Sequence, residues 1–157
     1  MIEKQLVNIN EVDGFFHDPE WYKPLLFGEN LYMNVTYLLP ETKMVIGSKK
    51  EKETEMPERV IYMLEGKLEV THGEDKFEIT PEMAFLVPLE SGEPFEIKNF
   101  GENMASFIMI FSPPPHPELK IKSRAQLRKL YEEHNRVVKS PEEMETFKAK
   151  VASKNKK

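Results

Sequence analysis

The chain contains 157 residues, of which 39% are hydrophobic and 31% are charged, with a formal net charge of −5 and no cysteine. This composition predicts one folded domain and excludes a disordered chain, disulfide bonds, thiol catalysis and thiolate metal sites. Because there is no run of about 18 apolar residues and the net charge is negative, we expect neither a membrane-spanning helix nor a nucleic-acid partner. The absence of cysteine and of a signal-peptide core indicates a cytoplasmic protein.

Residues 1–30 are predicted to form an aromatic-rich N-terminal arm. The stretch FFHDPEWYKPLLF, residues 15–27, contains five aromatic side chains. Within it, Asp18, Pro19 and Glu20 match a helix start, because Asp is a favoured N-cap and Pro a favoured first helical residue. So many aromatic side chains require burial. Two alternatives stay open: the arm covers an open end of the domain, or it packs against a second subunit.

Residues 31–115 are predicted to form a β-barrel domain. Short apolar runs recur at roughly ten-residue spacing between turn signals, which indicates a sandwich or barrel of about eight strands. Apolar and polar residues alternate in the segments KLEV (67–70) and KFEI (76–79), as in half-buried strands. The predicted fold class of the chain is therefore all-β.

Residues 116–157 are predicted to form a C-terminal helical extension that ends in a lysine-rich tail. Ser123 with Gln126, and Ser140 with Glu143, have the spacing of capping boxes at helix starts. Apolar residues then recur at helical spacing after each of these two signals. We therefore expect two helices to follow the barrel.

A charged cluster precedes the apolar run VIYML. The residues that set its spacing are Gly47, Glu53, Glu55, Arg59 and Gly66. Five residues separate the first pair, three separate Glu55 from Arg59, and six separate Arg59 from Gly66. This spacing resembles the first motif of the cupins, which are small jelly-roll barrels of the double-stranded β-helix type. Cupins have two histidines and a glutamate where this chain has Glu53, Glu55 and Arg59, and the resemblance implies that these three side chains point into the barrel.

A second, looser match follows in the sequence. Cupins carry a later motif of Gly, five residues, Pro-x-Gly, two residues, His, three residues and Asn. The positions that resemble it are Pro88, Gly92, Phe95 and Asn99, with Glu82 in place of the first glycine. The match requires two inserted residues before Gly92. Phe95 takes the place of the family's histidine, whereas Asn99 keeps the family's residue.

The resemblance places the family's four metal-ligand positions at Glu53, Glu55, Arg59 and Phe95, and none of them holds the family's residue. We therefore expect no bound metal and no cofactor. Arg59 would lie where a cation binds, and like unit charges about 4 Å apart repel by roughly 4 kcal/mol at an effective dielectric constant near 20. Carboxylate oxygens do suit Mg, Ca or Mn. A metal-dependent cupin with a non-standard carboxylate site thus stays open as an alternative.

From these positions we predict a cupin-domain protein that binds a small polar or anionic molecule in a metal-free barrel cavity. Arg59, Glu53 and Glu55 would supply the polar contacts, because guanidinium binds anions and carboxylates accept hydrogen bonds. Phe95 and Asn99 complete the predicted ligand site. Two alternatives carry no activity: a buried ion-pair network among the three charged residues, or a solvated surface cluster.

A further alternative is a metal-free acid–base enzyme of the isomerase, epimerase or lyase kind, acting on a small polar substrate such as a sugar derivative. Glu55 is the candidate catalytic residue, because a low-dielectric cavity can drive the pKa values of paired carboxylates apart. Glu53, Tyr32 and Tyr37 stay open as alternatives for this role. No histidine falls on a ligand position, and we expect His17, His116 and His134 to lie outside the barrel strands. We also expect a homodimer, since edge strands and an apolar arm need covering.

Overall fold

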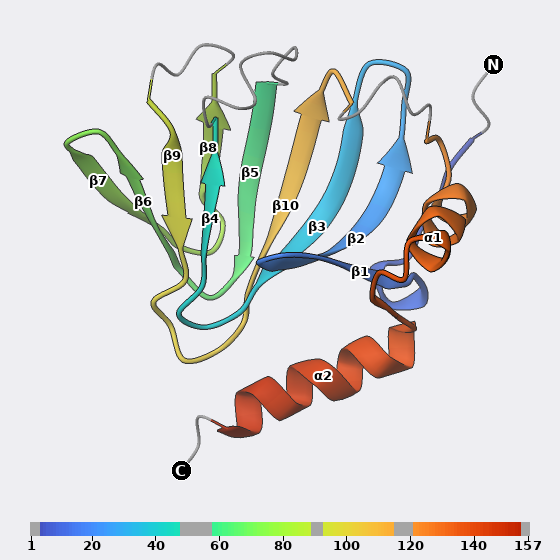
Figure 1. Cartoon of the computed structure of the whole chain (residues 1–157). Helices are drawn as coiled ribbons and strands as arrows, with labels where there is room; N and C mark the ends of the chain where they lie inside the picture. The colour runs from blue at the N-terminus through green and yellow to red at the C-terminus, as the bar shows by residue number, and fades with distance from the viewer. Residues whose placement is uncertain (1–3, 48–57, 89–92, 115–120, 155–157) are drawn as a thin grey trace.

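The computed structural model describes residues 4–47, 58–88, 93–114 and 121–154 (Figure 1). Their strands form two antiparallel sheets. The larger sheet has the strand order β11-β1-β2-β3-β10-β5-β8, and the smaller sheet has the order β4-β9-β6-β7. The predicted all-β barrel with a C-terminal helical extension is confirmed.

The element bounds follow the chain. The large sheet contains β1 (Gly14–His17), β2 (Glu20–Phe27), β3 (Tyr32–Leu38), β5 (Glu58–Glu65), β8 (Ala84–Val87), β10 (Ala105–Ser112) and β11 (Val138–Lys139). The small sheet contains β4 (Lys43–Ile46), β6 (Leu68–His72), β7 (Asp75–Ile79) and β9 (Phe95–Lys98). The helical elements are the 3-10 turn η1 (Ile9–Glu11), α1 (Arg124–Glu133) and α2 (Pro141–Lys154).

Side chains that alternate along the strands build the core between the two sheets. In β5, Ile61 and Met63 are fully buried, whereas Tyr62 between them is exposed. In the small sheet, Leu68 and Val70 of β6 join the same core cluster. Each fully buried side chain of this kind stabilises the fold by roughly 1.5–3 kcal/mol. This alternation leaves one face of each sheet toward the barrel interior.

The aromatic N-terminal segment is β-structure, so the helix predicted to begin at residues 18–20 is wrong. Residues 18 and 19 form the turn that joins β1 to β2, and both strands extend the large sheet beyond β3. Phe15 pairs with Tyr22 across this turn. Neighbouring residues of a strand point to opposite faces, so Tyr22 and Trp21 need burial on both faces of the sheet. That tertiary demand overrides the local helix signal.

The two helices cover opposite faces of this extension, at the end of the large sheet that carries β1 and β11 (Figure 1). On one face, Tyr131 of α1 contacts Phe15, with the ring centres 5.0 Å apart. On the other face, Phe147 of α2 contacts Trp21, with the ring centres 5.4 Å apart. The C-terminal extension therefore buries the aromatic side chains of the N-terminal strands within the same chain.

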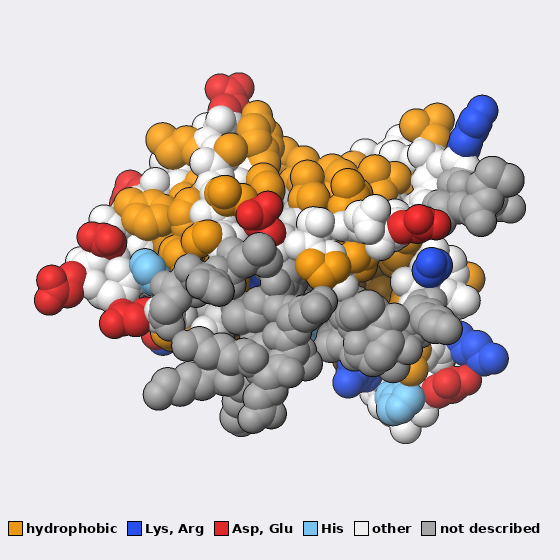
Figure 2. Space-filling model, turned by 90° about the horizontal axis from the view of Figure 1, so that it is seen from above, with side chains coloured by type: hydrophobic (Ala, Val, Ile, Leu, Met, Phe, Trp, Pro, Cys, Tyr) orange, Lys and Arg blue, Asp and Glu red, His pale blue; other side chains and the backbone are white. Residues whose placement is uncertain are grey.

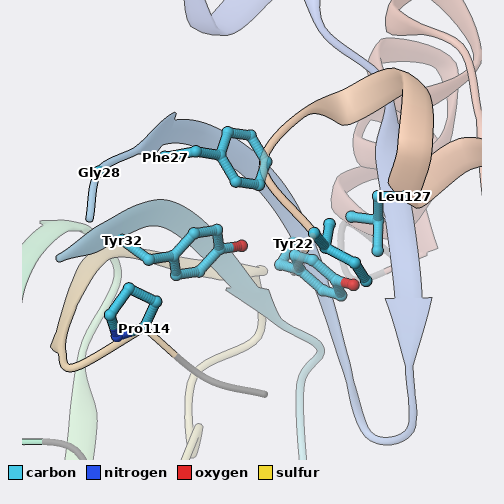
Figure 3. Close-up of a pocket in the computed structure, with 7 residues that line it drawn as sticks. Tyr22, Phe27, Gly28, Tyr32, Pro114 and Leu127 are labelled. Carbon is cyan, nitrogen blue, oxygen red and sulfur yellow. The ribbon is translucent and has the colours of Figure 1, made fainter. Parts of the chain in front are cut away.

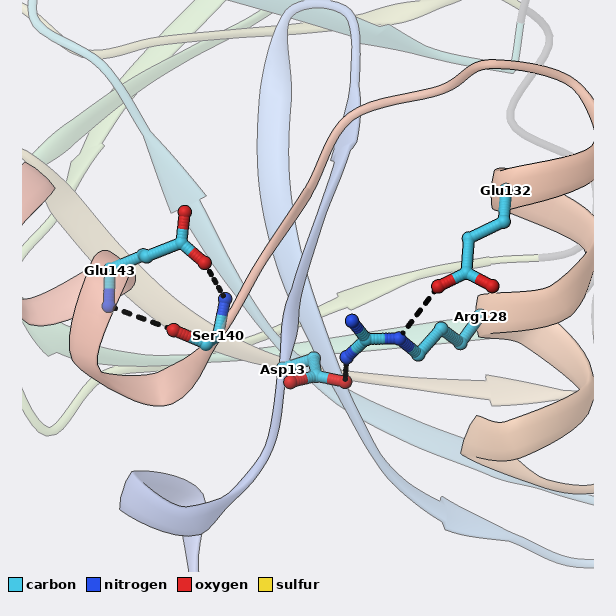
Figure 4. A network of polar contacts seen from close by, with 5 residues as sticks. All are labelled: Asp13, Arg128, Glu132, Ser140 and Glu143. Atoms are coloured by element: carbon cyan, nitrogen blue, oxygen red, sulfur yellow. Dashed lines mark hydrogen bonds and ion pairs between the residues drawn. The ribbon is translucent and has the colours of Figure 1, made fainter.

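Both predicted helix starts are confirmed. At α1, Ser123 Oγ accepts a hydrogen bond from the backbone N–H of Gln126. At α2, Ser140 Oγ accepts from the backbone N–H of Glu143, and a Glu143 carboxylate oxygen accepts from the backbone N–H of Ser140 (Figure 4). The hydrogen bond from the Ser140 backbone N–H favours the ionised carboxylate and lowers the pKa of Glu143. The reciprocal pair is the capping box that the sequence predicted.

An ion-pair network fixes α1 to the segment before β1. A guanidinium nitrogen of Arg128 lies 2.7 Å from a carboxylate oxygen of Asp13, and Arg128 Nε lies 2.9 Å from a carboxylate oxygen of Glu132 (Figure 4).

Within the ranges that the structure describes, neither helix is both long and apolar enough to cross a lipid bilayer.

Candidate ligand cavity in the barrel

A row of polar side chains runs along the inner face of β3. Tyr32, Asn34 and Thr36 occupy alternate positions of this strand, so they share one face. The Thr36 hydroxyl donates to Asn34 Oδ1 at 2.8 Å, and Asn34 Nδ2 donates to the Tyr32 hydroxyl oxygen at 3.3 Å. All three are buried. Burying a polar group without a hydrogen-bond partner destabilises the fold. These three side chains bond to one another and form a polar row in an otherwise apolar interior.

The polar row lines a cavity of about 190 Å³ between the two sheets. Its lining residues come from five strands of the large sheet and one of the small sheet: His17, Glu20, Tyr22, Tyr32, Asn34, Thr36, Met44, Arg59, Met109 and Phe111. A cavity of about 150 Å³ accepts one benzene molecule. The barrel cavity therefore has room for a small organic molecule.

Arg59 supplies a permanent positive charge to this cavity. It lies on β5 directly opposite Phe111 of β10, and its guanidinium carbon lies 5.1 Å from the centre of the Phe111 ring. The contact is a cation–π interaction that favours one orientation of the guanidinium. A planar guanidinium cannot be deprotonated in proteins and binds carboxylate or phosphate with two parallel hydrogen bonds.

His17 and Glu20 form a second charged group at the edge of the same cavity. They face each other across the β1–β2 turn, and His17 Nδ1 lies 3.4 Å from a Glu20 carboxylate oxygen. This hydrogen bond raises the pKa of His17 above its ordinary value of 6.5, against smaller opposing effects of burial and of Arg136. The His17 side chain is 63% exposed, so it lies at the mouth of the cavity and is open to solvent.

The prediction that His17 lies outside the barrel strands is wrong, because it is the last residue of β1 and lines the cavity. Sequence reasoning named Tyr32 as a possible acid–base residue but missed Asn34 and Thr36, which complete the polar row on β3. Its signal was present in the sequence, since Tyr32, Asn34 and Thr36 alternate with apolar residues in a predicted strand. Tyr37, on the opposite face of β3, packs beneath α2, where Lys148 Nζ lies 4.5 Å from its ring centre.

Burial raises the pKa of both cavity tyrosines, Tyr22 and Tyr32, so both phenols keep their protons at neutral pH. The Tyr22 hydroxyl lies 2.7 Å from the hydroxyl of Tyr131 on α1. The Tyr32 hydroxyl oxygen accepts from Asn34 and retains its own proton as a donor. Tyr32 can therefore donate a hydrogen bond to a molecule in the cavity.

The residues of the predicted ligand site occupy different surroundings. Arg59 lines the cavity, whereas Glu53 and Glu55 lie outside the described residues. Phe95 is a core residue whose ring stacks on His72, with centres 4.1 Å apart. It does not belong to the cavity lining.

Asn99 is fully buried at the end of β9, outside the lining of the barrel cavity. Its side-chain amide donates to the backbone carbonyls of Leu38 and Asn103, at 2.9 and 2.8 Å. Its carbonyl oxygen accepts from the backbone N–H of Gly101 at 2.8 Å. Every polar atom of the Asn99 side chain thus has a backbone partner. Asn99 therefore stabilises the loop that follows β9.

The described cavity residues do not fit the metal that the cupin resemblance implies. At two of the four family positions, Arg59 brings a cation and Phe95 has no ligand atom. Among the described residues, no group of three or more His, Asp or Glu side chains is placed to hold a metal ion.

Comparisons with known proteins give the fold a name. No protein-family model matches the sequence, and no curated protein matches it. Among solved structures, the chain is similar to the Cnp3 cupin domain of Schizosaccharomyces pombe, with 19% identity and a TM-score of 0.51 over 64% of this chain and 66% of that one. It is also similar to an RmlC-like cupin from Shewanella frigidimarina, with 14% identity and a TM-score of 0.59 over 74% and 96% of the two chains. The chain has the cupin fold.

A third similar structure is ectoine synthase from P. lautus, with 22% identity and a TM-score of 0.53 over 73% of this chain and 79% of that one. At these identities the likeness extends to the fold alone. Because one fold carries many functions, the function of this chain has to be argued from its own cavity.

Proposed function

We propose that this cupin-fold protein binds a small anionic molecule, such as a carboxylate, in the barrel cavity. The observation that supports this proposal is the position of Arg59 in a cavity that also contains the polar row of β3. The guanidinium would pair with the anionic group, and the Tyr32 hydroxyl would donate to a neighbouring oxygen. Glu53 and Glu55 remain predicted contacts from the sequence. The molecule would bind without a metal.

The cavity lining suits a molecule that is polar on one side and apolar on the other. Met44 and Met109 belong to the same lining as Arg59. Ligand sites are commonly apolar with a few polar groups that fix orientation. Among the described lining groups, Arg59 and Glu20 carry opposite charges, and protonation of His17 adds one positive charge. With His17 protonated, these groups carry a net positive charge, so the cavity favours an anion over a cation.

Binding can be measured by isothermal titration with acetate, butyrate and inorganic phosphate as probes. A hydrogen bond to a charged group contributes roughly 1.5–3 kcal/mol, so Arg59→Gln should weaken binding about 10- to 150-fold. Lys129→Gln is the matched control, because it removes one positive charge from the exposed face of α1. Circular dichroism establishes that each variant is folded. Equal affinity of the wild type and Arg59→Gln would refute the proposal.

A second candidate function is metal-free acid–base catalysis on a small polar substrate, which the His17–Glu20 pair favours. A histidine held by a carboxylate at a cavity mouth has the arrangement of a general base. The hydrogen bond to Glu20 raises the pKa of His17, which makes its imidazole a stronger base. Exchange of a substrate's carbon-bound hydrogen with deuterated solvent tests this function: it should occur in the wild type and be lost in His17→Gln. Exchange that persists in His17→Gln would exclude this histidine as the base.

A homodimer remains a prediction, and exposed apolar side chains on the large sheet support it. Tyr62 and Leu64 of β5 and Leu86 of β8 are 38%, 36% and 53% exposed on adjacent strands. Figure 2 shows hydrophobic side chains gathered in a broad area of the surface. Light scattering coupled to size-exclusion chromatography would distinguish a dimer from a monomer of 18.4 kDa.

A further inference from the structure

A second, smaller cavity of about 100 Å³ lies between the large sheet and the start of α1 (Figure 3). Its lining residues are Tyr22, Phe27, Gly28, Tyr32, Pro114, Ile121 and Leu127. None of these carries a charge, and the Tyr22 hydroxyl is already bonded to Tyr131. Apart from the two tyrosine hydroxyls, the lining is therefore apolar, in contrast to the barrel cavity with its arginine.

The two cavities are adjacent. Tyr22 and Tyr32 line both of them. The Tyr32 ring contacts Phe27 of the apolar cavity at 5.5 Å between ring centres, and it contacts Phe111 of the barrel cavity at 5.7 Å. Figure 3 shows the Tyr32 side chain directed toward Tyr22, between Phe27 and Pro114.

Arg59 stands at the far end of this series of contacts. Its guanidinium lies over Phe111, which contacts Tyr32, which contacts Phe27. The lining therefore changes from a positive charge in the barrel cavity, past the phenol of Tyr32, to apolar side chains in the second cavity. A molecule that extends through both cavities needs an anionic group at one end and an apolar group at the other.

We infer that the ligand of the barrel cavity is a short-chain aliphatic carboxylic acid whose apolar end occupies the second cavity. This inference rests on the proposed function, because it places the carboxylate against Arg59. The apolar space equals about three water volumes of roughly 30 Å³ each, and it is smaller than the ~150 Å³ cavity that accepts benzene. It therefore suits an aliphatic end of three or four carbons and excludes an aromatic ring.

A series of linear monocarboxylates from acetate to octanoate tests this inference by isothermal titration. Each buried methylene strengthens binding roughly fourfold, so affinity should rise along the series and stop rising once the apolar cavity is full. Benzoate should bind no better than a short acid. An affinity that is the same for acetate and hexanoate would overturn the inference while leaving the proposed anion site intact.

Variants of Ile121 test where the aliphatic end binds. Ile121→Phe places a ring in the apolar cavity, so affinity should no longer rise with chain length. Ile121→Ala enlarges the cavity, so the rise should continue to longer acids. Val45→Phe is the control, because it adds the same ring to an exposed position on β4 and should leave the rise unchanged. A normal rise in both Ile121 variants would overturn the inference.

The two proposals fail in different ways. Suppose that Arg59→Gln weakens the binding of every acid, and that the affinity of the wild type does not change with chain length. That result would retain the anion site and reject the apolar site. Absence of binding by phosphate and by every monocarboxylate to the wild type would reject both proposals, since the apolar site depends on the anion site. Binding of phosphate without any monocarboxylate would retain the anion site and reject the apolar site.

Discussion

Replacement of Asn99 by alanine gives a direct test of what this residue does. The resemblance to the second cupin motif predicts a ligand contact, whereas the structure surrounds its side chain with backbone groups. The Asn99 amide donates to the carbonyls of Leu38 and Asn103, and its oxygen accepts from the N–H of Gly101. Leu38 ends β3 of the large sheet, and Asn99 follows β9 of the small sheet. The side chain thus connects the ends of the two sheets.

The expected loss of stability follows from these three hydrogen bonds. A buried group left without its partner costs about 1–3 kcal/mol. Leu38 is fully buried, so its carbonyl would bear the full penalty, whereas solvent can reach the loop groups of Asn103 and Gly101. We therefore expect Asn99→Ala to lower the free energy of unfolding by about 3 kcal/mol. For a chain of this size, that corresponds to a decrease in Tm of roughly 6–12 °C.

Urea denaturation followed by the fluorescence of Trp21 measures the free energy of unfolding. Asn103→Ala is the matched control, because the Asn103 side chain is exposed and only its backbone carbonyl takes part. It should change stability by less than about 0.5 kcal/mol. A loss below about 1 kcal/mol in Asn99→Ala, together with weakened carboxylate binding, would refute the structural role and restore the predicted ligand contact.

Three further predictions concern packing, capping and pH. Gly14→Ala should destabilise the fold by about 1–3 kcal/mol in urea denaturation, because a Cβ atom there would lie 2.5 Å from Met144 Sδ. This loss of stability should be smaller in a Met144→Ala background, and an equal loss would contradict the steric cause. Ser140→Ala removes the cap of α2 and should cost about 1 kcal/mol of unfolding free energy, with no measurable change arguing against the capping box. The folded-state pKa of His17 is raised above 6.5 by Glu20, so the stabilisation from this pair is fully present below that pH and is lost as pH rises through the raised pKa. NMR titration should show a lower His17 pKa in Glu20→Gln, and an unchanged pKa would exclude the pair as its cause.

The sequence determined the fold class and the starts of the two C-terminal helices, because these depend on local patterns. Alternation of period two requires strands with one buried face, and the capping residues at Ser123 and Ser140 specify where the helices begin. The spacing from Gly47 to Gly66 predicted the cupin fold. It also predicted that Arg59 points into the barrel, and Arg59 lines the barrel cavity.

Only the tertiary structure decided how the cavity is built. Residues 18–20 favour a helix locally, but they form a turn and the start of a strand because the aromatic side chains around them are buried on both faces of the sheet. This pairing brings His17 to the cavity mouth. The apolar cavity combines Tyr22 and Tyr32 with Leu127, about 100 positions away in sequence, and such a space exists only after α1 packs on the sheet. Contacts between distant segments leave no periodic signal in the sequence, because the signal of each segment reports only its own buried face.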